Sequence, residues 1–355
     1  MASENAGDDF ASGYWQRRPG LNFDDSENAL PVDSSAVNDN TISSSFDYVH
    51  FVKFIALRSI PITKYEDLDF TIAQSKSIGS GAAMQVCMAT LKTELVAVKQ
   101  IRNRDPNIKI RDQGRAEDVS EKWLNDLYFE IQIMSHQPLC EHPNIVQLKG
   151  ISFDETRDGL YPFLIVEPAC EEYPDLTRLI RSSPQRLPAG PAADIIGDIA
   201  DGISVLHVYG VIHWDIKPDN ILIFKSAERG HGLKAKICDF GFSGSLLSED
   251  SPRGNTSAWA APEFQSNAPD LFKEYRWKSP QDVYSFALVA MFVLLGRPPI
   301  VDRDSEASQR MVSGLQPLTP EYPWLETFIP VIENCLEYDP SKRNTSIAGI
   351  RRLIV

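Results

Sequence analysis

The sequence is poor in the cysteine and histidine clusters that build disulfide frameworks and zinc sites. Its 355 residues include five cysteines, an odd number, and none of them forms a C-x-x-C pair. The six histidines show no metal-ligand spacing. Both kinds of site need such clusters, so we expect neither. This cysteine usage favours a reducing compartment, and we expect an intracellular location, cytoplasmic or nuclear.

Long hydrophobic runs are missing as well. The longest apolar stretch, residues 286–295, has ten residues, whereas a membrane-spanning helix needs about 20. The N-terminus also lacks the basic, apolar and small-residue pattern of a signal peptide. We therefore expect no membrane span and interpret residues 286–295 as a buried helix.

Basic residues are in deficit, with 35 Lys and Arg against 49 Asp and Glu, a net charge of −14. This balance argues against binding nucleic acid or anionic membranes through general electrostatics. Residues 1–46 are acidic, contain few apolar residues and show no periodicity, so we predict a disordered acidic tail. Tyr14 and Trp15 within it are a candidate docking motif. A tail that binds nothing is the alternative.

The rest of the chain has a globular composition and a length that suits two lobes. Residues 47–69 form an N-terminal extension with a short apolar stripe, which ends at Pro61. We expect this extension to pack on the part of the chain that follows it. Its stripe consists of Phe51, Phe54, Ile55 and Leu57.

The most informative segment is 211–222, VIHWDIKPDNIL, a polar loop between two apolar segments. A carboxylate, an ammonium group and a carboxamide lie close together in this loop. Asp215 can accept a proton from an attacking hydroxyl, and Lys217 can stabilise charge on a transferring phosphoryl group. The amide oxygen of Asn220 can bind Mg²⁺, a cation that prefers oxygen ligands.

Apolar alternation and turn residues predict strands over residues 70–77, 86–91 and 95–101. The segment Ile78-Gly79-Ser80-Gly81 lies between the first two strands. Its glycines let the backbone approach phosphate groups closely. Lys99 lies on the third strand, at a distance along the chain that lets it reach the same ligand.

These segments occur in the order found in eukaryotic-type protein kinases. The 211–222 loop resembles the catalytic loop H-R-D-x-x-x-x-N, with Trp214 in place of arginine. Residues 78–86 resemble the glycine-rich loop, with Met84 in place of the third glycine. Residues 96–99, Val-Ala-Val-Lys, resemble the V-A-I-K strand.

Four later segments extend the resemblance to residues 70–355. They are similar to the D-F-G turn, the A-P-E segment, the start of a central helix and the late D-P-x-x-R segment. Their defining residues are Asp239-Phe240-Gly241, Ala261-Pro262-Glu263, Asp282 and Arg343. Lys217 and Thr256 resemble the serine/threonine class, and the segment around Trp259 favours its tyrosine-kinase-like branch.

The resemblance implies an α+β, bilobal fold. A small β-rich N-lobe with one main helix would span residues 70–168, and a larger, mainly helical C-lobe would span 169–355. It also implies transfer of the γ-phosphoryl group of ATP to Ser or Thr hydroxyls of a protein substrate. Glu263 and Arg343 would form a buried ion pair, a feature that favours a protein substrate over a small molecule.

The resemblance assigns a role to each site residue. Asp215 and Lys217 would be catalytic, and Asn220 and Asp239 would hold Mg²⁺. Lys99 would bind the α- and β-phosphates, fixed by Glu130 on a helix predicted over residues 121–135. Glu121 and Asp126 are the alternative partners. The remaining nucleotide contacts would come from Ile78, Gly79, Ser80, Gly81, Val86, Ala97, Val166, Glu167, Ala169 and Leu222, with Glu167 and Ala169 offering backbone groups to adenine.

Trp214 is the departure that matters. In kinases with arginine at this position, the cation meets a phosphate on the activation loop, whereas tryptophan can only pack. We therefore expect activity that does not depend on phosphorylation within residues 243–257. The alternative function is that of a pseudokinase, which binds nucleotide or a partner and signals without transfer. The serines available to phosphorylation are Ser243, Ser245, Ser248 and Ser251.

Overall fold

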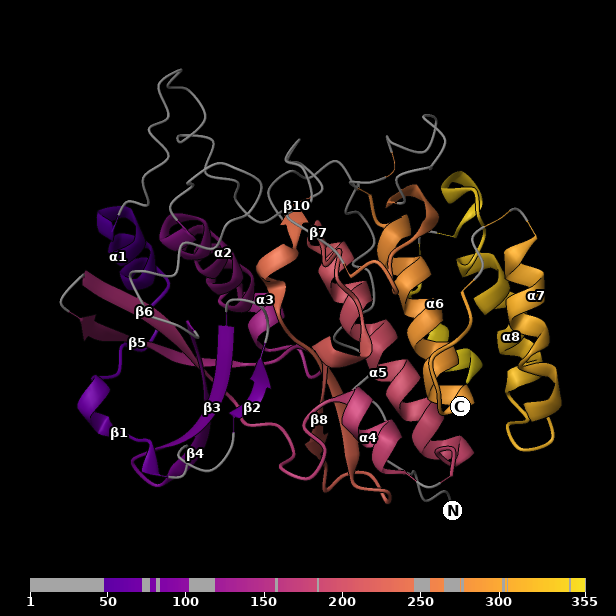
Figure 1. Cartoon of the computed structure of the whole chain (residues 1–355), viewed down its shortest axis with the longest axis horizontal. Coiled ribbons are helices and arrows are strands. Elements are labelled where there is room, and N and C mark those ends of the chain that lie inside the picture. The colour runs from indigo at the N-terminus through magenta and orange to yellow at the C-terminus, as the bar shows by residue number, and fades with distance from the viewer. Residues whose placement is uncertain are drawn as a thin grey trace, which may run out of the picture.

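The computed structural model combines a β-sheet part and a helical part (Figure 1). The predicted α+β, bilobal class is therefore confirmed, whereas the exact lobe boundaries remain a prediction. The predicted acidic tail, residues 1–46, lies outside the described residues. These are 48–71, 77–80, 84–101, 119–156, 159–183, 185–245, 256–264, 275, 278–301, 304, 306–344 and 346–354.

A six-stranded antiparallel sheet forms the first part. Its order is β1-β3-β4-β6-β5, and β2 pairs with β3. The strands predicted over 86–91 and 95–101 are present, whereas Thr71 lies in a 3₁₀ turn and β2 begins only at Ser77. The strands are β1 (Leu68–Asp69), β2 (Ser77–Ser80), β3 (Met84–Leu91), β4 (Glu94–Ile101), β5 (Leu148–Thr156) and β6 (Gly159–Val166).

The sheet register places several predicted nucleotide contacts on one face. Val86 is opposite Lys99, and Ala97 is opposite Val166. Directly opposed residues share a face, as do residues two apart on a strand, so these four side chains point to the same side. That side joins the main core of the molecule. The other face has its own apolar cluster, which includes Val98.

Helices make up most of the second part (Figure 1). The central helix α6 (Pro280–Leu295) is buried from its first residue to Leu294, which confirms the buried helix predicted for residues 286–295. Within the described residues, every helix is too short or too polar to span a bilayer. The others are α1 (Tyr48–Leu57), α2 (Val119–Met134), α3 (Gln137–Cys140), α4 (Leu176–Ser182), α5 (Ala189–Val208), α7 (Ala307–Ser313) and α8 (Leu325–Cys335).

Two short strand pairs lie beside these helices. The pair β8 (Ile221–Lys225) and β9 (Leu233–Ile237) carries the end of the polar loop and the start of the D-F-G segment. The pair β7 (Val211–Ile212) and β10 (Gly244–Ser245) joins the two outer ends of the same segments. The polar loop and the D-F-G turn are thus held side by side at both ends.

A buried ion pair joins two distant segments of the helical part, as predicted. The Arg343 guanidinium donates to both carboxylate oxygens of Glu263 at 2.7 and 2.9 Å, and neither side chain is exposed. Arg343 also donates to the Pro280 carbonyl at 3.1 Å. Because such a pair is stable only when its remaining donors are also satisfied, it fixes the A-P-E segment against the start of α6.

His142, just after α3, is a buried histidine that the structure holds uncharged. Its Nδ1 accepts a hydrogen bond from the Asn144 backbone N–H at 3.2 Å. Burial, reinforced by the positive charge of Lys234, lowers the pKa of His142 from 6.5 to about 4. Protonation at Nδ1 would remove the acceptor, so folding is coupled to pH through this residue.

We predict a loss of stability in mild acid that depends on His142. Between about pH 7.5 and about pH 5.5 the unfolded chain takes up a proton at this residue and the folded chain does not. The free energy of unfolding should therefore fall by about 1 kcal/mol more in the wild type than in His142→Gln. Urea unfolding at both pH values measures the difference, with the exposed His50→Gln as control. An equal pH effect in wild type and His142→Gln would contradict the prediction.

Candidate active site

The polar loop is held in place by a carboxylate from the central helix. Asp282, in the first turn of α6, accepts from the backbone N–H groups of His213 and Trp214 at 2.8 and 2.9 Å. It also contacts His207 Nε2 at 2.8 Å. These charge-assisted bonds hold Trp214 in the left-handed region, at φ +61°, and so set where the next residue, Asp215, points.

Asp215, Lys217 and Thr256 form a triangle of polar contacts. Lys217 Nζ donates to Asp215 Oδ2 at 2.5 Å and to Thr256 Oγ1 at 2.9 Å. The Thr256 hydroxyl donates to Asp215 Oδ1 at 2.7 Å. Lys217 and Thr256 are 39 residues apart in sequence, so the contact joins two distant segments around one carboxylate.

Asn220 orients the same carboxylate from a third direction. Its amide Nδ2 donates to the Asp215 carbonyl at 2.9 Å and to Asp215 Oδ2 at 3.1 Å. Since the amide nitrogen is used in these contacts, the amide oxygen is the atom that can serve a cation.

Lys99 joins the sheet to α2 and to the D-F-G turn. Its Nζ donates to both Glu130 carboxylate oxygens at 2.8 Å and to Asp239 Oδ1 at 2.8 Å. The structure thus pairs Lys99 with Glu130, the preferred candidate over Glu121 and Asp126. The Phe240 backbone N–H donates to Glu130 as well, which ties α2 to the same turn.

Lys99, Glu130 and Asp239 form a charged cluster in which each group affects the pKa values of the others. Burial disfavours the charged form of Lys99, but the carboxylates of Asp239 and Glu130 outweigh it and raise the pKa of the ammonium. Burial raises the pKa of Glu130 despite the attraction of Lys99. For Asp239, the partial burial of a side chain that is 47% exposed acts to raise the pKa, and Lys99 reverses this and lowers it. Lys99 and Asp239 therefore stay ionised at neutral pH.

The other predicted nucleotide contacts that the structure describes lie on strands β2, β3, β4, β6 and β8 and on the segment just after β6. Ala97 and Val166 are register partners between β4 and β6, and Leu222 on β8 bridges to Asp175. The backbone of Ile78, Gly79 and Ser80 forms β2, with Gly79 opposite Val86. Gly81 lies outside the described residues, and Ala169 packs beside the core just after β6.

Glu167 makes contacts with Gln147 and Lys236 that the sequence did not predict. Its backbone N–H donates to the Gln147 carbonyl at 3.1 Å, so the predicted backbone contact with adenine would have to use the Glu167 carbonyl. Its carboxylate accepts from Lys236 Nζ at 2.6 and 2.8 Å and from the Gln147 N–H at 2.8 Å. Lys236 was missed because a lysine in a strand normally faces solvent, and only the fold brings it to Glu167.

Trp214 packs where the usual arginine would carry charge. Its side chain is 2% exposed. A Cβ placed on Gly244 would lie 2.2 Å from the nearest atom of the indole ring. Gly244 is opposite Ile212 in the β7–β10 pair and lies within residues 243–257, which we call the activation segment. The ring therefore lies against the start of this segment. Only glycine leaves room for the ring there.

The phosphorylation sites named from the sequence are not equivalent. Ser243 was expected to be available, but it is 1% exposed, and its hydroxyl donates to the His213 carbonyl at 3.4 Å. It is buried because β10 pairs with β7 immediately beyond it. Ser245 is described by its backbone alone, and Ser248 and Ser251 lie outside the described residues.

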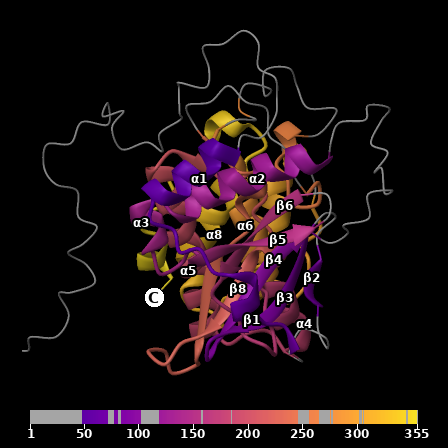
Figure 2. The same ribbon diagram turned by 90° about the vertical axis from the view of Figure 1, so that its left-hand side faces the viewer.

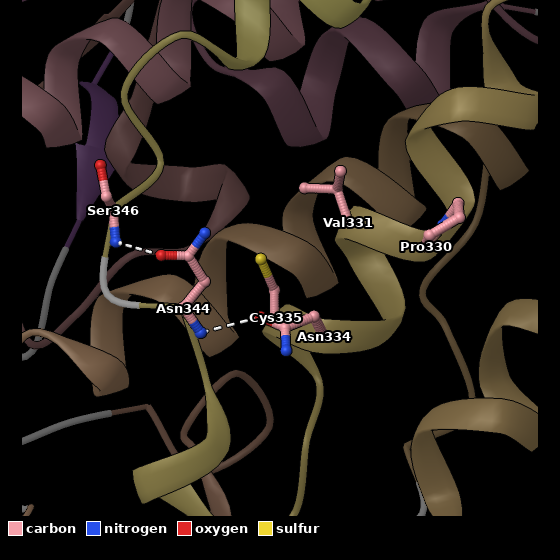
Figure 3. Close-up of a pocket in the computed structure, with 6 residues that line it drawn as sticks. All are labelled: Pro330, Val331, Asn334, Cys335, Asn344 and Ser346. Atoms are coloured by element: carbon pink, nitrogen blue, oxygen red, sulfur yellow. Dashed lines mark hydrogen bonds between the residues drawn. The ribbon is translucent and has the colours of Figure 1, made fainter.

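A surface pocket of about 220 Å³ in the helical part shares no residue with this site (Figure 3). Asn344 links two sides of it, accepting from the Ser346 N–H at 3.1 Å and donating its own N–H to Asn334 Oδ1 at 2.8 Å. The pocket is lined by Pro330, Val331, Asn334, Cys335, Asn344 and Ser346.

Comparison with known proteins gives a consistent family. The profile of the protein kinase domain matches residues 72–352. Serine/threonine-protein kinase 12 of Arabidopsis thaliana is 32% identical over 298 residues, which cover 81% of this chain and 56% of that protein. Serine/threonine-protein kinase ULK3 of Xenopus laevis is 27% identical over 292 residues, 81% of this chain and 55% of that protein.

The probable serine/threonine-protein kinase kinX of Dictyostelium discoideum is 30% identical over 287 residues, which cover 79% of this chain and 23% of that protein. The chain thus spans about half the length, or less, of these curated relatives. The relatives are serine/threonine kinases by name. Because the family profile covers most of the chain, the protein belongs to the protein kinase domain family, as the order of its motifs predicts.

Proposed function

We propose that the protein is an ATP-dependent protein kinase that transfers the γ-phosphoryl group to Ser or Thr hydroxyls of protein substrates. The observation that carries this proposal is the triangle of Asp215, Lys217 and Thr256. It places a proton acceptor beside a cation, and the Thr256 hydroxyl holds the two in position. Phosphoryl transfer to a substrate hydroxyl uses a positioned proton acceptor and positive charge near the phosphoryl group.

The residues present fit a nucleotide with Mg²⁺. Asp239 keeps 47% of its side chain exposed although it is bonded to Lys99, so its carboxylate can still receive a cation. The amide oxygen of Asn220 would be the second oxygen ligand of the cation. When bound, the metal would neutralise charge on the phosphates, which the loose transition state requires. Lys99, fixed by Glu130, would bind the α- and β-phosphates.

Asp215 is the proposed proton acceptor. Three donors, from Lys217, Asn220 and Thr256, orient its carboxylate before a substrate arrives. A preoriented acceptor avoids reorganisation at the moment of reaction. Lys217 is bonded to Asp215, so it lies beside the point at which the substrate hydroxyl would receive the phosphoryl group. There its positive charge would offset the negative charge of the phosphoryl group. The site residues named here act together, so the loss of any one should impair transfer.

Two other functions are less well supported. A pseudokinase would lack some of the groups needed for transfer, whereas this chain has the full set. Lys99 is bonded to Glu130 and Asp239, and Asn220 is bonded to Asp215. A small-molecule kinase would have no evident need for the buried pair of Glu263 and Arg343, which supports a protein substrate.

We also propose that activity does not require phosphorylation of residues 243–257. Trp214 offers no charge to a phosphate, and its ring is already in contact range of Gly244. Packing in this place would order the start of the activation segment without a modification. We further propose an intracellular location, and docking of a partner through the acidic N-terminal tail.

The phosphotransfer proposal can be tested with Mg²⁺-ATP and a generic acceptor protein. Asp215→Asn should reduce the rate on the order of 10²-fold or more because the proton acceptor is lost. Asp219→Asn, an exposed residue of the same loop, is the matched control and should keep the rate. Mass spectrometry should find phosphate on Ser or Thr. An unchanged rate in Asp215→Asn would refute the role of this residue.

If activity is independent of phosphorylation, phosphatase treatment should leave it nearly unchanged. Phosphatase treatment of the purified, active protein should change the initial rate of phosphoryl transfer by less than about twofold, because no phosphate is needed to order residues 243–257. Removal of phosphate is checked by intact mass. A large drop in rate, reversed when phosphate is restored at a serine within residues 243–257, is the result that contradicts the proposal.

The contact between Trp214 and Gly244 predicts strong coupling between the two positions. Gly244→Ala should destabilise the fold by about 2 kcal/mol and lower activity, because its methyl group overlaps the indole ring. Gly230→Ala is the control, since a Cβ there meets no atom within 4 Å. In the background of Trp214→Leu the penalty of Gly244→Ala should shrink. Equal penalties in both backgrounds, measured by urea unfolding, would disprove the contact.

A further inference from the structure

Helix α1 lies outside the part of the chain that the family profile matches. The profile begins at residue 72, whereas α1 spans Tyr48–Leu57. In both views α1 lies beside α2, the helix that carries Glu130 (Figures 1 and 2). Two of its residues, Phe51 and Ile55, are each 1% exposed, so the helix is integrated into the core.

The contact between α1 and α2 is made by aromatic rings. Phe51 and Phe54 meet Tyr128 of α2 edge-on, with ring centroids 5.9 and 5.1 Å apart. Phe51 also meets Phe153 of β5 at 6.4 Å. Edge-to-face pairs of this kind add to the apolar area they bury, so the cluster fixes the position of α2 relative to the sheet.

The chain that follows α1 is attached to the sheet as well. The Ile151 backbone N–H donates to the Pro61 carbonyl at 2.9 Å, and the Thr63 N–H donates to the Ile151 carbonyl at 2.9 Å. This makes a parallel bridge on β5, next to Gly150. A Cβ on Gly150 would lie 2.7 Å from the Pro61 carbonyl oxygen, so this close approach requires glycine.

Tyr128 and Glu130 point to opposite sides of α2. Residues two apart on an α-helix are separated by about 200° around its axis. The ring cluster therefore holds the side of α2 that faces away from Lys99, while Glu130 bonds Lys99 on the other side. Helix α2 is held between α1 and the ion pair.

We propose that residues 48–63, which we call the N-terminal strap, hold α2 in the orientation that lets Glu130 pair with Lys99. Phe51 and Phe54 are then positioning residues for phosphoryl transfer. The kinetic part of the proposal rests on the proposed function, whereas the placement of α2 does not. If the strap only covered apolar surface, its loss would lower stability without a specific effect on α2.

Hydrogen exchange of the full-length protein tests the placement directly, whether or not the protein transfers phosphate. Phe51→Ala should speed exchange of the α2 amides roughly tenfold, because their local opening becomes easier. Phe51→Leu should restore most of the protection. Phe328→Ala, which removes an equally buried ring from α8, is the matched control and should leave α2 protected. Equal loosening of α2 by Phe51→Ala and Phe328→Ala would overturn the proposal.

Gly150→Ala tests the strap at its other end and leaves every aromatic ring in place. It should displace the Pro61 attachment and speed exchange in α2 in the same direction as Phe51→Ala. This variant keeps the proposal falsifiable if Phe51→Ala fails to fold. Normal α2 protection in a folded Gly150→Ala variant whose 60–63 amides have lost protection would contradict the proposal.

Kinetics test the link to Glu130. In the wild-type background Phe51→Ala should lower kcat roughly tenfold with little change in KM for the acceptor protein. In the Glu130→Gln background, which already lacks the ion pair, the same change should have little further effect on kcat. Additive losses in the two backgrounds would show that the strap does not act through Glu130. A wild type with no transfer at all would refute the proposed function but not the exchange result.

Discussion

The ammonium group of Lys99 is the point on which the arrangement of the site depends. It is nearly buried, with 13% of its side chain exposed, and a buried charge is tolerated only when it is paired. Its two partners come from α2 and from the turn after β9. The energetic need to pair this charge therefore couples three elements that are far apart in the chain. Any movement of α2 or of the turn that separates a carboxylate from Lys99 leaves a charge uncompensated.

A second set of interactions positions the polar loop of residues 211–222, and the charge in this set is a buried carboxylate. The carboxylate of Asp282 is fully buried and receives two backbone N–H groups from the loop. The Trp214 ring then fills the space beside Gly244. The hydrogen bond to Asp282 and the packing on Gly244 both act on Trp214, the residue next to Asp215. Electrostatics and close packing together therefore orient Asp215, and neither depends on a ligand.

Residues whose partners follow from motif order could be predicted from the sequence. Glu130 was preferred over Glu121 and Asp126 as the partner of Lys99 because of the segment that follows its helix, and the geometry agrees. The buried pair of Glu263 and Arg343 was predicted in the same way. In these cases the chemistry of the group limits what its partner can be.

Contacts that depend on shape could not be predicted. The sequence shows Gly244 as one more glycine in a loop, and only the distance to the indole ring reveals why it must be glycine. Lys236 was missed and Ser243 was expected to be available, because a polar side chain is normally exposed, whereas both are buried. The strand predicted from residue 70 begins only at Ser77, since Thr71 belongs to a turn.

The close fit of Trp214 and Gly244 also has a consequence for how the sequence can evolve. A lineage that loses the ring before position 244 acquires a side chain avoids the overlap of about 2 kcal/mol that the opposite order would meet, so one order of substitution is favoured.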